Sequence, residues 1–241
     1  MIKFFRKIRY NLLETGKTSK YLKYAIGEII LVVIGILIAL SINNWNEIRK
    51  QKETTNSIYV IVKEDLINDI SEINLILKYH DEVRKPSFET VLNTNLTKED
   101  WLKNPQYLSV IDGFKDFSIN QRGFELLKNQ SNLIANTKQN LASEINLFYN
   151  QHLVEIDVAI DELFRENVDI NKNLKKHDWF SSFLLHKETE GIIDYISNNT
   201  IAKNEIALYY VIFDVYAQEL RNFRENAKNI IIKIDQQLKE N

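Results

Sequence analysis

The chain has 241 residues, of which 44% are hydrophobic and 27% charged, a balance typical of a folding chain and not of a disordered one. Only two prolines and six glycines interrupt it, so long helices are expected. The absence of cysteine excludes disulfides, cysteine-ligated zinc and iron–sulfur clusters.

The net charge of −2 is unevenly distributed along the chain. Residues 1–23 carry seven Lys and Arg and one Glu, whereas residues 46–241 carry 24 Lys and Arg against 31 Asp and Glu. Nucleic-acid binding needs a basic face, which this acidic region lacks. We therefore expect no nucleic-acid partner.

Residues 25–42 read AIGEIILVVIGILIALSI, with Glu28 as the one charge. As a helix they would span about 27 Å, close to the ~30 Å hydrocarbon core of a bilayer. We expect residues 24–43 to form a transmembrane helix. Tyr21, Tyr24 and Trp45 stand at its two edges, where amphipathic rings prefer to lie, and are its predicted interface anchors.

The excess of Lys and Arg before this helix predicts a cytoplasmic N-terminus. The predicted parts are a basic cytoplasmic tail (1–23), the span (24–43) and a translocated domain (44–241). Residues 2–13 also suit an amphipathic helix in the inner headgroup layer, and a frayed tail is the alternative. A role of the basic tail in setting the topology alone is the simpler account of its charge. A cleaved signal peptide and a buried core helix are the alternatives. The length of the stretch, its apolar character on all faces and the lack of an A-x-A site before Asn43 argue against them.

One face of the predicted span carries Glu28, Gly35 and Ala39. Gly35 and Ala39 form a small-x-x-x-small pattern, which allows two helices to approach closely. This face is a candidate for self-association or for a partner, with Glu28 hydrogen-bonded across it. The alternative is that Glu28 extends to the nearby interface and the small residues are incidental.

Residues 24–40, YAIGEIILVVIGILIAL, followed at 42–47 by INNWNE, resemble an uncharacterised family of single-pass proteins of Gram-negative bacteria, known only as a domain of unknown function. Residues 2–9 and GFELLK at 123–128 are also similar to it. The family has Gln where Ser41 stands and a glycine shortly after Lys128. The resemblance implies a periplasmic outer domain and a place in the bacterial inner membrane, and it brings no activity.

Three long helices are expected after the span. The first continues from the membrane to about His80, where Pro86 and Ser87 end it or turn the chain. The others cover about 137–170 and 201–238. Each has an apolar stripe at spacings of three and four, and the last stripe steps almost as a coiled-coil heptad. The stripes include Tyr59, Val62, Leu66, Ile70, Ile73, Leu77 and His80; Leu141, Ile145, Phe148, His152, Ile156, Ala159 and Leu163; and Ile206, Tyr209, Phe213, Tyr216, Leu220, Phe223, Ala227, Ile230 and Ile234.

The region 88–134 is more broken. A capping box predicts a helix that starts after Thr97, and Asn104-Pro105 ends it. Further short helices are expected at 178–184 and 188–197. Core side chains are expected from Phe114, Phe117, Phe124, Leu126 and Leu127. The predicted fold class is therefore all-α: a transmembrane helix continuing into an antiparallel bundle of three long helices plus short ones.

The patterns for chemistry are weak. His152-x-x-Glu155 reverses the motif of di-iron bundles and occurs once, so a core histidine is the simpler interpretation. Acidic residues between 155 and 169 fit a solvated face, and Tyr209, Tyr210, Phe213 and Tyr216 fit core packing better than a ligand pocket. No nucleotide, hydrolase or zinc-protease motif is present. We predict no catalytic, cofactor-binding or metal-binding residues, and a protein that is not an enzyme.

The resulting hypothesis is a membrane-anchored interaction or scaffold module whose partners are the lipid bilayer and an envelope protein or a second copy. The alternative is a periplasmic sensor or small-ligand-binding bundle acting through a separate protein. An anchor, a packed helical domain and no recognisable chemistry motivate both.

Overall fold

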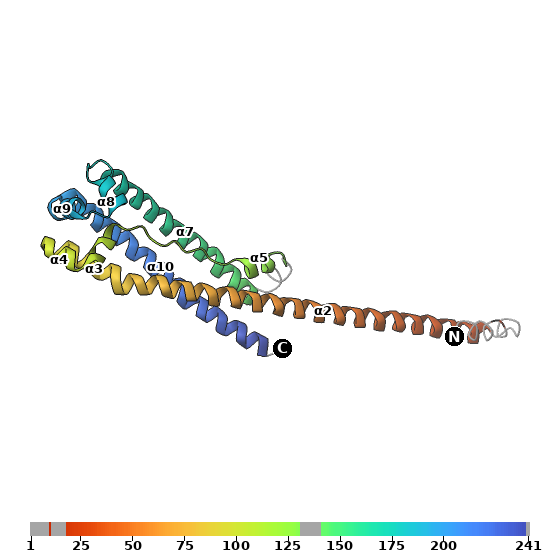
Figure 1. The fold of residues 1–241 in the computed structure, drawn as a ribbon. Coiled ribbons are helices and arrows are strands. Elements are labelled where there is room, and N and C mark those ends of the chain that lie inside the picture. The colour runs from red at the N-terminus through yellow and green to blue at the C-terminus, as the bar shows by residue number, and fades with distance from the viewer. Residues whose placement is uncertain (1–9, 11–17, 131–140, 240–241) are drawn as a thin grey trace. The chain divides into compact units, whose positions relative to one another are not determined.

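The computed structural model describes residue 10 and residues 18–130 and 141–239, and these form helices and connecting segments without a strand (Figure 1). The predicted all-α class is thus confirmed for the described part of the chain. Two compact units are distinguished, Met1–Ser57 and Ile58–Asn241. Most of the predicted basic tail (1–23) lies outside the described residues.

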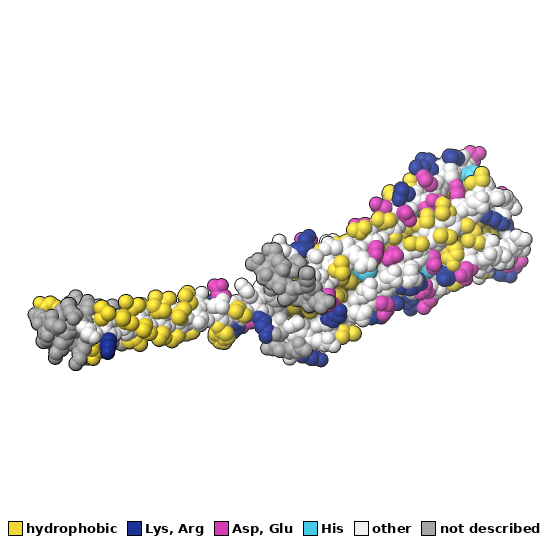
Figure 2. Space-filling model, turned by 180° about the vertical axis from the view of Figure 1, so that it is seen from behind, with side chains coloured by type: hydrophobic (Ala, Val, Ile, Leu, Met, Phe, Trp, Pro, Cys, Tyr) yellow, Lys and Arg dark blue, Asp and Glu magenta, His cyan; other side chains and the backbone are white. Residues whose placement is uncertain are grey.

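Helix α2 (Thr18–Tyr79) begins in the first unit and contains the apolar stretch. All twelve of its Ile, Leu and Val side chains between 26 and 42 are exposed, and Figure 2 shows hydrophobic side chains covering the visible side of this stretch. Among the described residues, one helix is long and apolar enough to cross a membrane, by length and composition, and it is this one.

Within the second unit, which we call the helical unit (Ile58–Asn241), the C-terminal part of α2 leads into a π-helical turn, η1 (His80–Arg84), and then into α3 (Lys85–Asn93). The predicted stripe is buried, with Ile70 half-buried. The expected stop at Pro86 is wrong. Pro86 occupies the first turn of α3, where its missing N–H is tolerated, and the wider π turn precedes it.

The connection from α3 to α7 contains short elements and one long extended segment. Helix α4 (Lys98–Lys103) carries the predicted capping box between Thr97 and Asp100 and is followed by a 3₁₀ helix, η2 (Pro105–Ile111). The chain then runs without regular structure from 112 to 121 until α5 (Arg122–Lys128). We call residues 112–121 the strap. Its Phe117 is buried as predicted, but Leu126 of α5 is exposed because α5 turns it outward.

Helices α7 (Leu141–Leu174) and α10 (Thr200–Lys239) lie side by side and run in opposite directions (Figure 1). Glu144 near the start of α7 pairs with Lys233 near the end of α10, and Asn173 at the end of α7 pairs with Glu205 near the start of α10. The two helices are therefore antiparallel. The α10 stripe is buried at every predicted position, and the α7 stripe is buried except for half-buried Leu141. Helices α8 (Phe180–His186) and α9 (Glu190–Asn198) connect the pair.

At Gly123 the backbone of α5 lies close to the backbone of α2. A Cβ atom added there would lie 2.5 Å from the backbone nitrogen of Val62 in α2, whereas one added at Gly113 would meet nothing within 4 Å. Backbone atoms cannot move aside as a flexible side chain can. The glycine is therefore required for α5 to lie on α2.

We predict that Gly123→Ala destabilises the protein by about 1–3 kcal/mol, because the methyl group forces α5 away from α2. Thermal unfolding followed by circular dichroism of the detergent-solubilised chain measures this. Gly113→Ala is the matched control and should change the melting temperature little. Equal effects of the two substitutions would contradict the assignment.

Candidate functional site

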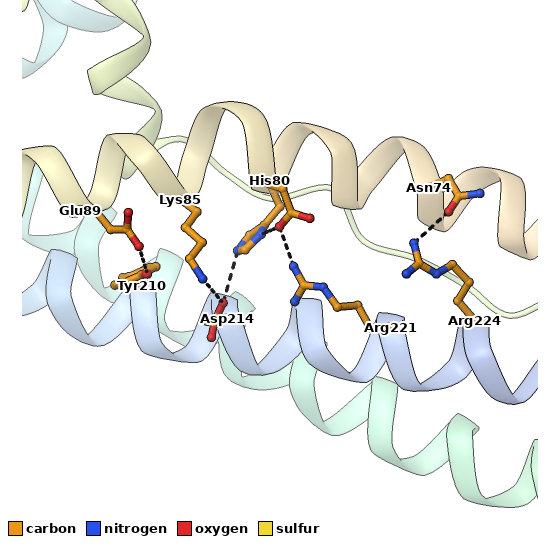
Figure 3. A network of polar contacts seen from close by, with 9 residues as sticks. Asn74, His80, Lys85, Glu89, Tyr210, Asp214, Arg221 and Arg224 are labelled. Carbon is orange, nitrogen blue, oxygen red and sulfur yellow. Dashed lines mark hydrogen bonds and ion pairs between the residues drawn. The ribbon is translucent and has the colours of Figure 1, made fainter.

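The polar side chains at the centre of the helical unit connect η1 and α3 to α10 (Figure 3). Arg221 donates to Asp81 at 2.5 Å, Tyr210 donates to Glu89 at 3.2 Å, and Arg224 donates to Asn74 at 3.1 Å. These contacts fix α2, η1 and α3 along one side of α10.

His80 lies at the middle of this set and is fully buried. Its ring stacks on Phe213 at 5.2 Å, and its Nδ1 lies 2.8 Å from Asp81. The Nε2 atom is 3.9 Å from Asp214, which is too long for a hydrogen bond, and it has no other partner among the described residues. Burial lowers the pKa of His80 more than the neighbouring carboxylates raise it, so the imidazole is neutral at neutral pH.

Arg84, at the end of η1, is a cation with only 1% of its surface exposed. Its guanidinium donates to the carbonyl oxygens of Asp112 at 3.0 Å and Gly113 at 2.9 Å, and it lies 4.2 Å from the ring centre of Phe213. Tyr209 donates to the same Asp112 carbonyl at 3.1 Å. The planar fork of an arginine suits two neighbouring carbonyls, so Arg84 fixes the start of the strap.

Two buried carboxylates of α2 fix the other end of the strap. Asp69 accepts hydrogen bonds from the backbone and side-chain nitrogens of Asn120, the latter at 2.6 Å. Asp65, one turn earlier, accepts from the backbone nitrogen of Gly123 at 2.7 Å, in the first turn of α5. Burial is the main cause that raises the pKa of Asp69 to about 7, and nearby Asp65 and Glu72 add to it.

His152 is buried against Phe148 and Phe223, as expected for a core histidine. Its Nε2 lies 3.1 Å from the Asn226 amide nitrogen, and its Nδ1 lies 3.2 Å from a Glu155 oxygen. Burial lowers its pKa. Among the described residues, no three His, Asp or Glu side chains are grouped as metal ligands would be.

The predicted membrane-face residues lie on α2. Gly35 and Ala39 are exposed, Glu28 is half-exposed, and a Cβ atom added at Gly35 would meet nothing within 4 Å. Tyr24 and Trp45 are exposed, and the Arg49 guanidinium lies 5.6 Å from the Trp45 ring. The side chain of Tyr21 lies outside the described residues. The association face and the interface anchors stay predictions.

Sequence reasoning missed Asp65, Asp69 and Arg84. The sequence did contain a sign that the two aspartates are buried. They stand four residues apart, on one helix face, next to Leu66 and Ile70 of the apolar stripe of α2. Arg84 carried a weaker signal, since a charge just before Pro86 fits an exposed helix end equally well. The polar atoms of all three residues face distant segments of the chain: Arg84 and Asp69 bond to the strap, and Asp65 bonds to the first turn of α5.

In the residues that the structure describes, the chain is thus of the all-α class, with one candidate membrane helix and a set of buried polar side chains at the strap. A family model described as "Family of unknown function (DUF6090)" matches residues 28–124. That range contains most of the apolar stretch and extends to Phe124 in α5. The expected similarity to a family of unknown function is confirmed to this extent. No curated protein and no solved structure matches the chain.

Removing the Asp69 charge should alter the pH dependence of stability. The folded pKa of about 7 lies above the ordinary 3.8, so the folded state binds the proton more tightly. Stability should therefore fall as pH rises from about 4 to about 7. We expect Asp69→Asn to remove roughly 1–3 kcal/mol of this fall, because the amide does not titrate. Denaturant unfolding at a series of pH values measures it, with exposed Asp157→Asn as control.

Arg84→Ala should destabilise the chain by about 3 kcal/mol, because it removes two donors from buried carbonyls and leaves a cavity beside Phe213. Arg165→Ala removes an exposed arginine and serves as the comparison. Hydrogen exchange read by mass spectrometry should show faster exchange in the strap for the first variant alone. Unchanged exchange in the strap would refute the role given to Arg84.

Proposed function

We propose that the chain is a single-pass, membrane-anchored interaction module of the bacterial envelope. In this proposal residues 24–43 cross the inner membrane, residues 1–23 stay in the cytoplasm, and residues 44–241 form a periplasmic antiparallel bundle. The exposed aliphatic stretch of α2 is the observation that carries the proposal.

The free energies of transfer favour insertion of this stretch into a lipid bilayer. Moving twelve exposed Ile, Leu and Val side chains out of water stabilises the inserted state by on the order of 20 kcal/mol. The opposing cost of Glu28 at the centre of a bilayer is about 3 kcal/mol, and it is smaller near the interface. The charge of +6 before the span supports a cytoplasmic N-terminus.

The interaction role is supported by what the buried polar groups do. Arg84, Asp65 and Asp69 bond to backbone atoms of the strap and α5, so their polar atoms serve the fold. The matched family brings no activity. What remains for function is the surface of the helical unit and the face of α2 with Glu28, Gly35 and Ala39, which we propose as a place of self-association.

A sensor acting through a separate protein is the second candidate. Helix α2 holds both the apolar stretch and Asp69, whose pKa of about 7 is within the physiological range. A change in proton binding there would act on the same helix that we propose to cross the membrane.

Membrane insertion is tested by replacing Ile34 and Leu37 with lysine. The wild-type chain should sediment with membranes through an alkaline wash, and a phosphatase fused to its C-terminus should be active outside the cytoplasm. The double variant should be recovered from the membranes in smaller amount than the wild-type chain, since two charges at the centre of the span cost about 6 kcal/mol and interrupt the apolar run.

The control places lysine at exposed Leu184 and Leu185 of α8, outside the apolar stretch. This variant should stay with the membranes. A wild-type chain recovered in the soluble fraction, or a C-terminal reporter active in the cytoplasm, would overturn the proposal.

A further inference from the structure

The outer side of the paired helices α7 and α10 combines exposed apolar and acidic side chains, and a cavity opens between the two helices at one end of it. We call this side of the helix pair the α7–α10 groove. Figure 2 shows that hydrophobic and acidic side chains lie interspersed over the helical unit. The exposed apolar positions recur at helical spacing: Leu147, Val154 and Val158 on α7, and Ile201, Leu208 and Val215 on α10. They are not part of the core stripes.

Glutamates share these faces. Glu155 and Glu162 flank Val158 at three and four residues, and Glu219 follows Val215 by four, so these side chains lie on common helix faces. Glu155 of α7 and Glu219 of α10 both act to raise the pKa of His152 against the effect of burial, so both charges lie near this histidine. Further along, burial together with Asp169 and Glu205 raises the pKa of Glu166.

This acidic charge is not neutralised within the described chain. Among the described residues, none of Glu155, Glu162, Glu166, Glu205 and Glu219 forms an ion pair with a lysine or arginine. Elsewhere on these helices such pairs are common, as at Glu144–Lys233, Asp169–Lys172 and Asp235–Lys63. The one lysine that lines the cavity of the groove, Lys233, is already paired with Glu144, so the groove keeps an excess of acidic side chains beside exposed apolar surface.

A cavity of about 290 Å³ opens in the groove where Leu147, Phe148, His152 and Asn226 meet. His152 is 1% exposed, and its Nδ1 makes no hydrogen bond of good geometry among the described residues, although a Glu155 oxygen lies 3.2 Å away. A large apolar side chain of a partner would fit this cavity.

We propose that the α7–α10 groove binds a basic amphipathic helix of a partner protein, with its apolar face on Val158 and Val215 and its Lys and Arg side chains beside the glutamates. This rests on the proposed interaction function and specifies the chemistry of its partner. Apolar anchors along one helix face give affinity, and opposite charge gives register and speed of association. A second copy would bring the same acidic groove, and anionic lipid would also be repelled.

The test uses the full chain in phosphatidylcholine discs and a fluorescent peptide of about 18 residues, built from Leu and Lys with the leucines on one helical face. Binding should be saturable after subtraction of empty discs, and it should weaken at high salt. A peptide of the same composition in scrambled order should bind at least about tenfold more weakly, because it lacks the apolar face.

Two double variants examine the groove: Glu162→Lys with Glu219→Lys, and Val158→Ser with Val215→Ser. Each should weaken binding at least about tenfold. The control, Asp116→Lys with Glu188→Lys, changes net charge as much at exposed positions in the strap and between α8 and α9, and it should bind as wild type. Circular dichroism confirms that each variant is folded.

Equal binding by the groove variants and the control, or equal binding of the scrambled peptide, would overturn this inference. The proposed function fails separately, in membrane fractionation. A chain that stays in membranes but binds the peptide equally in all variants refutes only the groove. A chain that binds through the groove but is soluble refutes only the anchor.

Discussion

The strap cannot satisfy its own backbone hydrogen bonds, and much of the helical unit is arranged to meet that need. Helices pair their N–H and C=O groups internally, whereas an extended segment packed on a core must find partners elsewhere. Arg84 and Tyr209 bond to Asp112, Tyr216 bonds to the Lys115 carbonyl, and Asp69 accepts from Asn120. Buried Arg84 and Asp69 therefore serve the backbone of the strap.

The same need explains the irregularity of the first long helix in the helical unit. A regular α-helix through residues 80–84 would place its side chains at different angles from the π turn that is present. The π turn places His80 against Phe213 and Arg84 under the strap, and α3 can then begin with Pro86 in its first turn. The π turn thus suits both the local start of α3 and the contacts that His80 and Arg84 make with distant residues.

The placement of polar side chains, some buried in the core and others exposed on the helix surfaces, also limits where a partner could bind. Because the buried Arg and Asp side chains are committed to backbone partners, recognition is left to the outer faces. Along α7 and α10 those faces combine exposed aliphatic side chains with glutamates that have no cationic partner in the described chain. Such a surface favours association with a cationic, amphipathic segment over association with lipid headgroups or nucleic acid.

The sequence by itself determined the helical class, the apolar stretch of α2, the buried stripes of α7 and α10 and the cap at Thr97, because each depends on residues within a few turns of one another. Only the tertiary structure decided that Asp69 and Arg84 turn inward, that Leu126 turns outward, and that α7 and α10 form a groove. Those outcomes depend on which distant segments meet, and helical periodicity carries no information about that.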